Sequence, residues 1–286
     1  MKGRIIKGVG GLYVVSSQGK HYNCKARGKF RHNNSTPMVG DEVCFDVEKE
    51  NDGVIGEICP RVSELIRPFV SNVTQAFVVF TVKSPDINLD LLNRFLVLCQ
   101  YNNLNIVLCI NKMDLVEEGY GEEIFKMLDT LPYDKIYLNC HKDNMESIKC
   151  RLKDHISVFC GPSGVGKSTI LNSLIGVEHM ETGDISIKLK RGKHTTRHAE
   201  LIEYEEGFVV DTPGFSSIKT DFIEKEELQN CFPEIRELAG NCKFSNCMHH
   251  KEPGCSVKLK VGEEIHPLRY QAYIKILEEI INTRRY

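Results

Sequence analysis

A glycine-rich segment in the middle of the chain carries the clearest chemical signature. Residues 161–168 read Gly-Pro-Ser-Gly-Val-Gly-Lys-Ser, which fits the phosphate-loop pattern G-x-x-x-x-G-K-[ST]. In such loops backbone N–H groups and a helix N-terminus bind phosphate, the lysine reaches the terminal phosphates, and the serine hydroxyl binds Mg²⁺. A chance glycine turn is the alternative, but an apolar stretch precedes the loop and a helical pattern follows it. The segment therefore predicts nucleoside triphosphate binding.

A second motif indicates which base is bound. Asn111-Lys112-Met113-Asp114 directly follows an apolar stretch, 105–110. Guanine presents two adjacent donors, N1–H and N2–H₂, to the two oxygens of a carboxylate such as Asp114, whereas adenine presents an acceptor at N1. A site built in this way rejects the wrong base by a factor of about 10⁴. The four residues also occur by accident on protein surfaces, but beside a phosphate loop they predict GTP.

A third motif, Asp211-Thr-Pro-Gly214, follows the apolar stretch 207–210. An aspartate at a strand end can hold the hydration shell of Mg²⁺, and a glycine N–H can meet the γ-phosphate. An ordinary turn is the alternative. Between the phosphate loop and this motif lies a basic segment, 188–197, in which Thr195 or Thr196 could supply a second hydroxyl to Mg²⁺. A solvated loop and a nucleotide-dependent switch both fit that segment.

The order of these motifs is unusual. In Ras-like GTPases the phosphate loop precedes the base-reading motif, whereas here residues 111–114 precede residues 161–168. A parallel sheet can keep the spatial order of its strands wherever the chain is cut. The sequence therefore predicts a circularly permuted GTPase, in which Asp211 leads directly into the C-terminal region.

That C-terminal region holds a cluster of cysteine and histidine. Cys242, Cys247, Cys255, His249 and His250 fall within fourteen residues. Thiolate and imidazole ligands at a tetrahedral count select Zn²⁺, and a closed set of four is structural rather than catalytic. The alternative, free cysteines in a small core, fits poorly because the segment is polar. Spacing alone leaves open which histidine binds.

The elements that must position these groups follow from residue patterns. Five short β-rich segments bounded by Gly, Asn, Asp or Pro favour a five-stranded barrel of the OB-fold type; they are 4–6, 12–15, 21–26, 42–47 and 54–58. Strands and helices then alternate, which indicates a doubly wound, mostly parallel sheet. The expected strands are 76–82, 105–110, 135–139, 157–160 and 207–210. One expected helix contains the apolar residues from Leu89 to Cys99, and the others cover 122–130, 145–154, 168–175 and 267–283.

Length and composition set the outer limits. A chain of 286 residues suits one large or two to three small domains, and we expect three: 1–65, 66–219 and 220–286. No apolar run reaches the roughly 18 residues of a membrane span. The twelve cysteines read as thiols or metal ligands in a reducing compartment, so the cytoplasm is expected. The net charge is −2, but residues 1–36 hold eight cationic side chains and no acidic one.

Taken together, the motifs resemble one family: the ribosome small-subunit-dependent GTPases (RsgA/YjeQ-like). The motifs that support this resemblance are 111–114, 161–168, Gly192-Lys-His-Thr-Thr-Arg197, 211–214 and the C-x₄-C-x-H-x₅-C pattern that ends at Cys255. The resemblance implies an OB-fold, a permuted GTPase domain and a mainly helical zinc domain. It also implies a late-stage assembly factor of the small ribosomal subunit, whose rRNA stimulates GTP hydrolysis.

The resemblance also assigns residues. It implies that Cys242, Cys247, His249 and Cys255 hold one structural zinc. Ser168, Thr195, Thr196 and Asp211 are expected near Mg²⁺. The expected nucleotide-binding residues are Asn111, Lys112, Asp114, Gly161, Pro162, Ser163, Gly164, Val165, Gly166, Lys167, Ser168, Thr169, Asp211 and Gly214. Two departures stand out: Leu138-Asn-Cys140 replaces a Ser-Ala base contact, and Lys193 replaces an arginine.

The catalytic group is the least determined feature. Phe215 occupies the position where Ras-type enzymes place a water-orienting glutamine, so we expect slow hydrolysis by the isolated protein. His194 is our candidate for the missing group; a mere RNA or solvent contact is the alternative. The basic barrel is the expected rRNA reader, although it could instead be a solvated face. A monomer without membrane contact is expected, and the rival functions are a non-catalytic GTP sensor and a GTP-driven zinc-handling protein.

Overall fold

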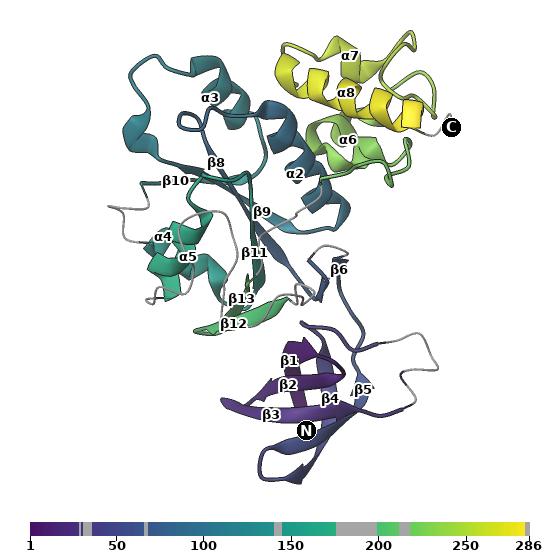
Figure 1. The fold of residues 1–286 in the computed structure, drawn as a ribbon. Coiled ribbons are helices and arrows are strands. Elements are labelled where there is room, and N and C mark those ends of the chain that lie inside the picture. The colour runs from purple at the N-terminus through teal and green to yellow at the C-terminus, as the bar shows by residue number, and fades with distance from the viewer. Residues whose placement is uncertain are drawn as a thin grey trace. The chain divides into compact units, whose positions relative to one another are not determined.

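The computed structural model describes residues 1–28, 30, 36–65, 68–139, 145–175, 199–211 and 218–283. The helices and strands are labelled in Figure 1, and the chain divides into two compact units. One comprises residues 1–76, 144–160 and 168–216, and the other comprises 77–143, 161–167 and 217–286. Within the described ranges, none of the helices combines the length and the apolar character that a membrane span needs.

The first five strands close into a barrel. They are β1 (Lys2–Val9), β2 (Leu12–Ser17), β3 (Lys20–Ala26), β4 (Glu42–Lys49) and β5 (Asp52–Ile58). β1 pairs antiparallel with β2 and β4, β2 with β3, and β4 with β5, while β3 and β5 are parallel. Alternate residues of β2 are buried, as expected for strands with one face on a core. The predicted OB-type barrel is confirmed.

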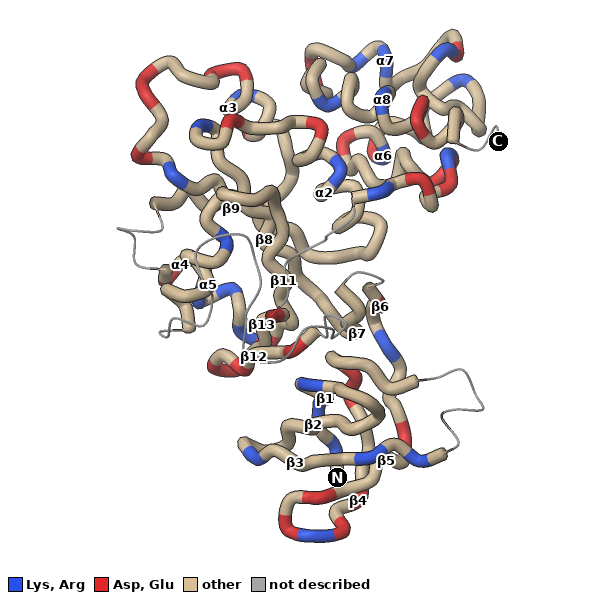
Figure 2. The backbone as a smooth tube through the Cα atoms, in the orientation of Figure 1, with Lys and Arg blue, Asp and Glu red and all other residues tan. Residues whose placement is uncertain are grey.

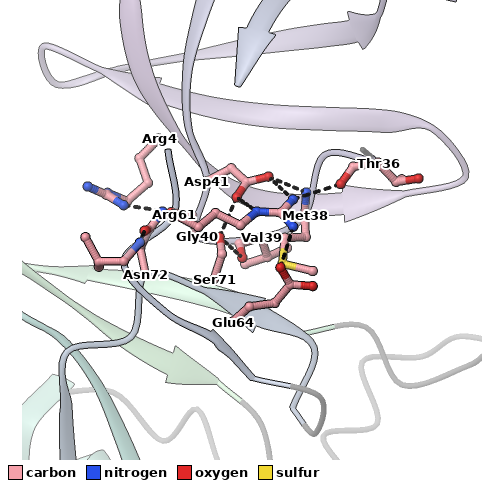
Figure 3. A network of polar contacts seen from close by, with 11 residues as sticks. Arg4, Thr36, Met38, Val39, Gly40, Asp41, Arg61, Glu64, Ser71 and Asn72 are labelled. Carbon is pink, nitrogen blue, oxygen red and sulfur yellow. Dashed lines mark hydrogen bonds and ion pairs between the residues drawn. The ribbon is translucent and has the colours of Figure 1, made fainter. Parts of the chain in front are cut away.

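A buried carboxylate ties the end of the barrel to the short pair β6 (Glu64–Leu65) and β7 (Val70–Ser71) (Figure 3). Asp41 is 0% exposed and accepts hydrogen bonds from Arg61 Nε at 2.7 Å, Ser71 Oγ at 2.6 Å and the Met38 backbone N–H at 2.8 Å. The hydrogen bonds to Asp41 raise the pKa of the Arg61 guanidinium. Gly40 adopts φ +96°, and a Cβ there would lie 2.0 Å from the Ser71 carbonyl oxygen. Only glycine allows this close approach.

The remaining strands and helices alternate along the chain. They are β8 (Gln75–Thr81), α2 (Leu89–Tyr101), β9 (Asn105–Asn111), η1 (Met113–Leu115), α3 (Glu122–Asp129), β10 (Asp134–Tyr137), α4 (Glu146–Leu152), β11 (Ile156–Cys160), α5 (Lys167–Ile175), β12 (Glu200–Tyr204) and β13 (Gly207–Asp211). Within one unit β8 lies beside β9, which pairs in parallel with β10. Within the other, β11 and β13 are parallel neighbours. The expected mostly parallel, doubly wound sheet is present.

Two details differ from the sequence expectation. β12, which the sequence patterns did not indicate, forms an antiparallel hairpin with β13. Only one of its five residues is buried, so its sequence, Glu-Leu-Ile-Glu-Tyr, lacks the apolar run that marks the other strands. The predicted strand 135–139 is Asp134–Tyr137 in the structure, and one further bond, from Leu138 N–H to the Ile110 carbonyl, follows it.

The C-terminal module consists of η2 (Leu228–Cys231), α6 (Pro233–Ala239), α7 (Ser256–Leu259) and α8 (Pro267–Thr283). Its apolar core includes Phe232, Tyr273 and Ile276 and also Val97 of α2. Arg269 is 0% exposed, donates to Glu234 Oε1 at 2.7 Å and to Asn93 of α2, and lies over the Phe232 ring. The module is therefore built directly on α2.

A second set of charges joins the same two elements. Arg94 of α2 donates to Glu279 of α8 at 2.6 Å and to Asp90 at 3.2 Å. Burial opposes ionisation of Asp90, but hydrogen bonds from Arg94 and Lys275 outweigh it and hold the pKa of Asp90 below its ordinary value. Polar and apolar contacts thus join α2 to α8.

The Asp41 cluster gives a stability prediction. Arg61→Met should lower the free energy of unfolding by about 3–5 kcal/mol, because it leaves the buried Asp41 carboxylate without its cation. Arg27→Met is the matched control: its 2.8 Å pair with Asp46 is exposed, so it should cost about 1 kcal/mol or less. Urea unfolding followed by far-UV circular dichroism measures both. Equal losses in the two variants would contradict the role given to the Asp41 cluster.

Candidate nucleotide site and metal centre

The phosphate loop leaves the sheet after a fully buried strand. All five residues of β11 are buried, and Gly161 follows with φ +142°. A Cβ on Gly161 would lie 2.0 Å from the Val79 carbonyl oxygen, so only glycine lets the loop begin this close to β8. Lys167, the first residue of α5, donates from Nζ to the carbonyls of Gly161 at 2.9 Å and Pro162 at 2.6 Å. The loop thus curls around the lysine ammonium at the start of a helix, as phosphate binding requires.

The base-reading motif is bonded to this loop. Asn111 ends β9, is 0% exposed, and donates from Nδ2 to the Val165 carbonyl at 2.8 Å. The two bonded residues are 54 positions apart in the chain, and their motifs come in the order opposite to that of Ras-like GTPases. The structure therefore brings together the segments that the permutation hypothesis requires to meet.

The rest of the motif is set by backbone geometry. Lys112 adopts the left-handed conformation, φ 59° and ψ 40°, and its Nζ donates to the Ser84 carbonyl at 2.7 Å. Met113 N–H bonds to the Leu138 carbonyl at 3.0 Å, which fixes the following turn. Asp114 lies in η1 and is exposed, so its carboxylate is accessible to a ligand.

The other predicted residues lie partly within the described structure. Asp211 is the last residue of β13, and because β13 is parallel to β11, it lies at the same end of this strand pair as Cys160, the last residue of β11. Ser168 and Thr169 lie in the first turn of α5 and are half-buried. Gly214, Thr195, Thr196, His194, Phe215, Lys193 and Cys140 lie outside the described residues.

Three cysteines and one histidine meet in the C-terminal module. The ligand atoms of Cys242, Cys247, His249 and Cys255 all lie within 4.8 Å of one another. His249 Nδ1 is 3.5 Å from Cys242 Sγ and 3.4 Å from Cys255 Sγ, and the two sulfurs are 3.9 Å apart. Bonds of about 2.3 Å to sulfur and 2.1 Å to nitrogen put tetrahedral zinc ligands about 3.6–3.8 Å apart. The donor set and its dimensions fit one zinc ion.

The surroundings distinguish the two histidines. His249 is buried, and its Nε2, which faces away from the sulfurs, lies 2.8 Å from Gln229 Oε1. An outer partner of this kind fixes the ring orientation of a metal-binding histidine. His250 instead lies 3.2 Å from Glu278 of α8. The structure thus brings together the four residues that the resemblance implied, and it places His250 outside them.

The sequence did not predict three hydrogen-bond partners of the site residues. The carbonyls of Val165 and Ser84 accept the bonds from Asn111 and Lys112, but a backbone acceptor leaves no mark on residue type. Gln229 is twenty residues before His249 and belongs to no motif. Only the folded chain shows these partners.

The two histidines give a paired prediction. His249→Ala should lose the one zinc ion per chain expected for the wild type, because it removes one of four ligands. His250→Ala, the adjacent control, should keep one zinc per chain. Elemental analysis after dialysis against a weak chelator measures both. Retention of zinc in the His249 variant together with its loss in the His250 variant would reverse our assignment.

Comparisons with known proteins agree with this architecture. Residues 58–221 match the profile of the RsgA GTPase family, and residues 2–55 match the RsgA N-terminal domain. A protein of Clostridium botulinum (strain Langeland), "Small ribosomal subunit biogenesis GTPase RsgA", is 57% identical over 289 residues, covering 100% of this chain and 99% of its own length. The protein of the same name from Clostridium novyi (strain NT) is 54% identical over 287 residues, with the same coverage.

Solved structures show the same likeness. YloQ, described as a circularly permuted GTPase, has a TM-score of 0.85 and 38% identity, covering 99% of this chain and 95% of its own. YjeQ from Thermotoga maritima also has a TM-score of 0.85, with 34% identity and coverage of 98% of both chains. With its reversed motif order, its barrel and its full-length relatives, the chain belongs to the RsgA GTPase family.

Proposed function

We propose that this protein hydrolyses GTP to GDP and phosphate during late assembly of the small ribosomal subunit. Membership of a GTPase family makes hydrolysis of GTP its activity, and the full-length relatives are named for biogenesis of that subunit. The observation that carries the proposal is the buried bond from Asn111 to the Val165 carbonyl, because it joins the base-reading motif to the phosphate loop.

We assign the nucleotide contacts by chemistry. Asp114, exposed beside the loop, would accept N1–H and N2–H₂ of guanine. The loop N–H groups and Lys167 would bind the phosphates, with Thr169 and Gly214 as further contacts. Ser168 and Asp211 would hold Mg²⁺ directly or through water, with Thr195 and Thr196 as candidates for the remaining hydroxyl. Bound Mg²⁺ would neutralise charge that develops on the phosphates.

We propose that the C-terminal cluster holds one structural zinc ion. Four ligands leave no open position for a substrate, and α8 carries tyrosines that support the ligand loop: Tyr270 and Tyr273 donate to the carbonyls of His249 and Met248. The three domains that we propose, 1–65, 66–219 and 220–286, would serve RNA contact, GTP hydrolysis and zinc binding in that order.

We propose that the barrel contacts rRNA in the cytoplasm, with the protein acting as a monomer. On β3 Tyr22 and Cys24 point into the barrel, whereas Asn23 and Lys25 are exposed on the strand that OB-folds use for nucleic acid. Figure 2 shows cations along β1–β3, while acidic residues crowd the β4–β5 turn. Lys2 and Arg27 pair with Glu42 and Asp46, so the cationic surface is smaller than the sequence count suggests.

We propose that His194 supplies the catalytic group when the subunit binds. Its position within a basic segment, 188–197, supports this role, because rRNA phosphates could attract that segment. Phe215 cannot orient water, so another group must supply this function.

GTP turnover with and without purified subunits tests both proposals. Small subunits should stimulate the wild type, large subunits should not, and His194→Ala should lose about 10³-fold or more of the stimulated rate. His198→Ala, at the histidine that directly follows this segment, is the control and should keep the stimulated rate.

The opposite results are equally informative. An unchanged stimulated rate in the His194 variant would contradict its catalytic role. A wild type that small subunits fail to stimulate would contradict the assembly function and favour a non-catalytic GTP sensor. Zinc that exchanges during turnover would instead favour a zinc-handling protein.

A further inference from the structure

A short turn between β8 and α2, outside every recognised motif, borders the proposed nucleotide site. We define the 83–86 turn as Lys83, Ser84, Pro85 and Asp86. Two local hydrogen bonds hold its shape: Thr81 Oγ1 donates to the Pro85 carbonyl at 2.6 Å, and Ile87 N–H donates to the Val82 carbonyl at 3.3 Å. Asn88 then caps α2 by accepting from Leu91 N–H. The turn is therefore a defined structural element.

The 83–86 turn is bonded to the base-reading motif and lies beside the phosphate loop. The Ser84 carbonyl accepts from Lys112 Nζ at 2.7 Å. Pro85 borders the phosphate loop, because a Cβ added to Gly164 would lie 3.9 Å from Pro85 Cδ. Ser84 itself has φ +59°, which turns the backbone sharply at this point. One turn thus bridges the base-reading lysine and the loop.

This contact fixes where the lysine side chain runs. Lys112 is held at its backbone between Asn111, which bonds to Val165, and the turn at Met113, and it is held at its tip by Ser84. Its methylene stem therefore runs between two fixed points, its own backbone beside Asp114 and the 83–86 turn. A guanine read by Asp114, with its phosphates at the loop, would lay one face against that stem, where methylenes and an ammonium both favour an aromatic ring.

An outer set of contacts holds the turn from the other side. Lys83 Nζ lies 2.7 Å from Glu117 and 5.2 Å from the centre of the Tyr120 ring, and Tyr120 OH donates to Asp86 at 3.1 Å. Glu117 and Tyr120 belong to the segment that follows Asp114 directly. The turn is consequently linked to the base-reading segment at two places, through Lys112 and through this outer set.

We propose that Glu117 and Tyr120 are positioning residues, which hold the 83–86 turn so that Lys112 lies against the guanine face, and that they thereby set how long a guanine nucleotide stays bound. The proposal rests on the nucleotide site proposed above. It adds the element that orients Lys112.

Dissociation of fluorescent GDP, followed by stopped flow, tests the proposal. Glu117→Gln and Tyr120→Phe each remove one contact and keep the side-chain shape. Each should speed dissociation by about two- to fivefold, the value of an exposed ion pair or hydrogen bond. The control is Glu123→Gln on α3, an exposed carboxylate that pairs with Lys126 at 2.6 Å and lies 4.0 Å from His266. It should leave the rate unchanged, because neither partner belongs to the 83–86 turn.

Further measurements separate positioning from general loosening. Dissociation of inosine diphosphate should speed up by the same factor as that of GDP, because the stem contacts the ring face and not the 2-amino group. Pyrophosphate affinity and the melting temperature should not change. Unchanged dissociation of both nucleotides, or an equal loss of pyrophosphate affinity, would overturn the proposal. If the wild type binds GDP no better than ATP, the proposed nucleotide site itself is wrong. If the wild type prefers GDP but the Glu117 and Tyr120 variants release it at the wild-type rate, only the role of the turn is refuted.

Discussion

The hydrogen bond from Asn111 Nδ2 to the Val165 carbonyl holds the two nucleotide motifs together, and the other features of the site follow from it. Both groups are buried, and a buried amide without a partner is costly, so the end of β9 and the phosphate loop must stay together. Chain order is irrelevant to this bond. A permuted GTPase can therefore keep the spatial arrangement of its motifs while the chain passes through them in another order.

The C-terminal module packs on the helix that follows the 83–86 turn. The module follows β13 in the chain, and it packs on α2 through Val97, Asn93 and Arg269. α2 begins at Leu89, three residues after the end of the 83–86 turn, which contacts Lys112. The guanine-reading segment is thus connected to the zinc-compatible module through the 83–86 turn and α2. This is a spatial connection, and coupling between the two would have to be measured.

Residue types and spacing were sufficient where side chains perform the chemistry. The phosphate loop, the strand before it, residues 111–114 and the buried face of α2 all follow from motif and periodicity. The choice of His249 over His250 needed the family resemblance, because both have the same chemistry and adjacent positions. The Leu-Asn-Cys element at 138–140 was a doubtful base contact, and its first residue has a different role in the structure, because the Leu138 carbonyl accepts from Met113.

The sequence could not reveal partners that are backbone atoms or that are distant in the chain. Ser84 and Val165 act through carbonyls, and the cation for Asp41 comes from Arg61, twenty positions away. Counting cationic residues over 1–36 likewise overestimated the free positive charge of the barrel. Glu42 and Asp46, which pair with Lys2 and Arg27, lie after that stretch in the sequence. Pairing across strands is a property of the barrel and not of any window of sequence.

Nucleotide selectivity of an Asp114→Asn variant is the sharpest test of this arrangement. Xanthine carries a carbonyl where guanine carries its 2-amino group, so an amide at position 114 can donate to it, whereas a carboxylate cannot. We expect the wild type to prefer GTP and the variant to prefer xanthosine triphosphate, with ATP weak for both. An unchanged preference for GTP in the variant, or ATP binding as tight as GTP binding in the wild type, would contradict the assembly of residues 111–114 and 161–168 around one guanine nucleotide.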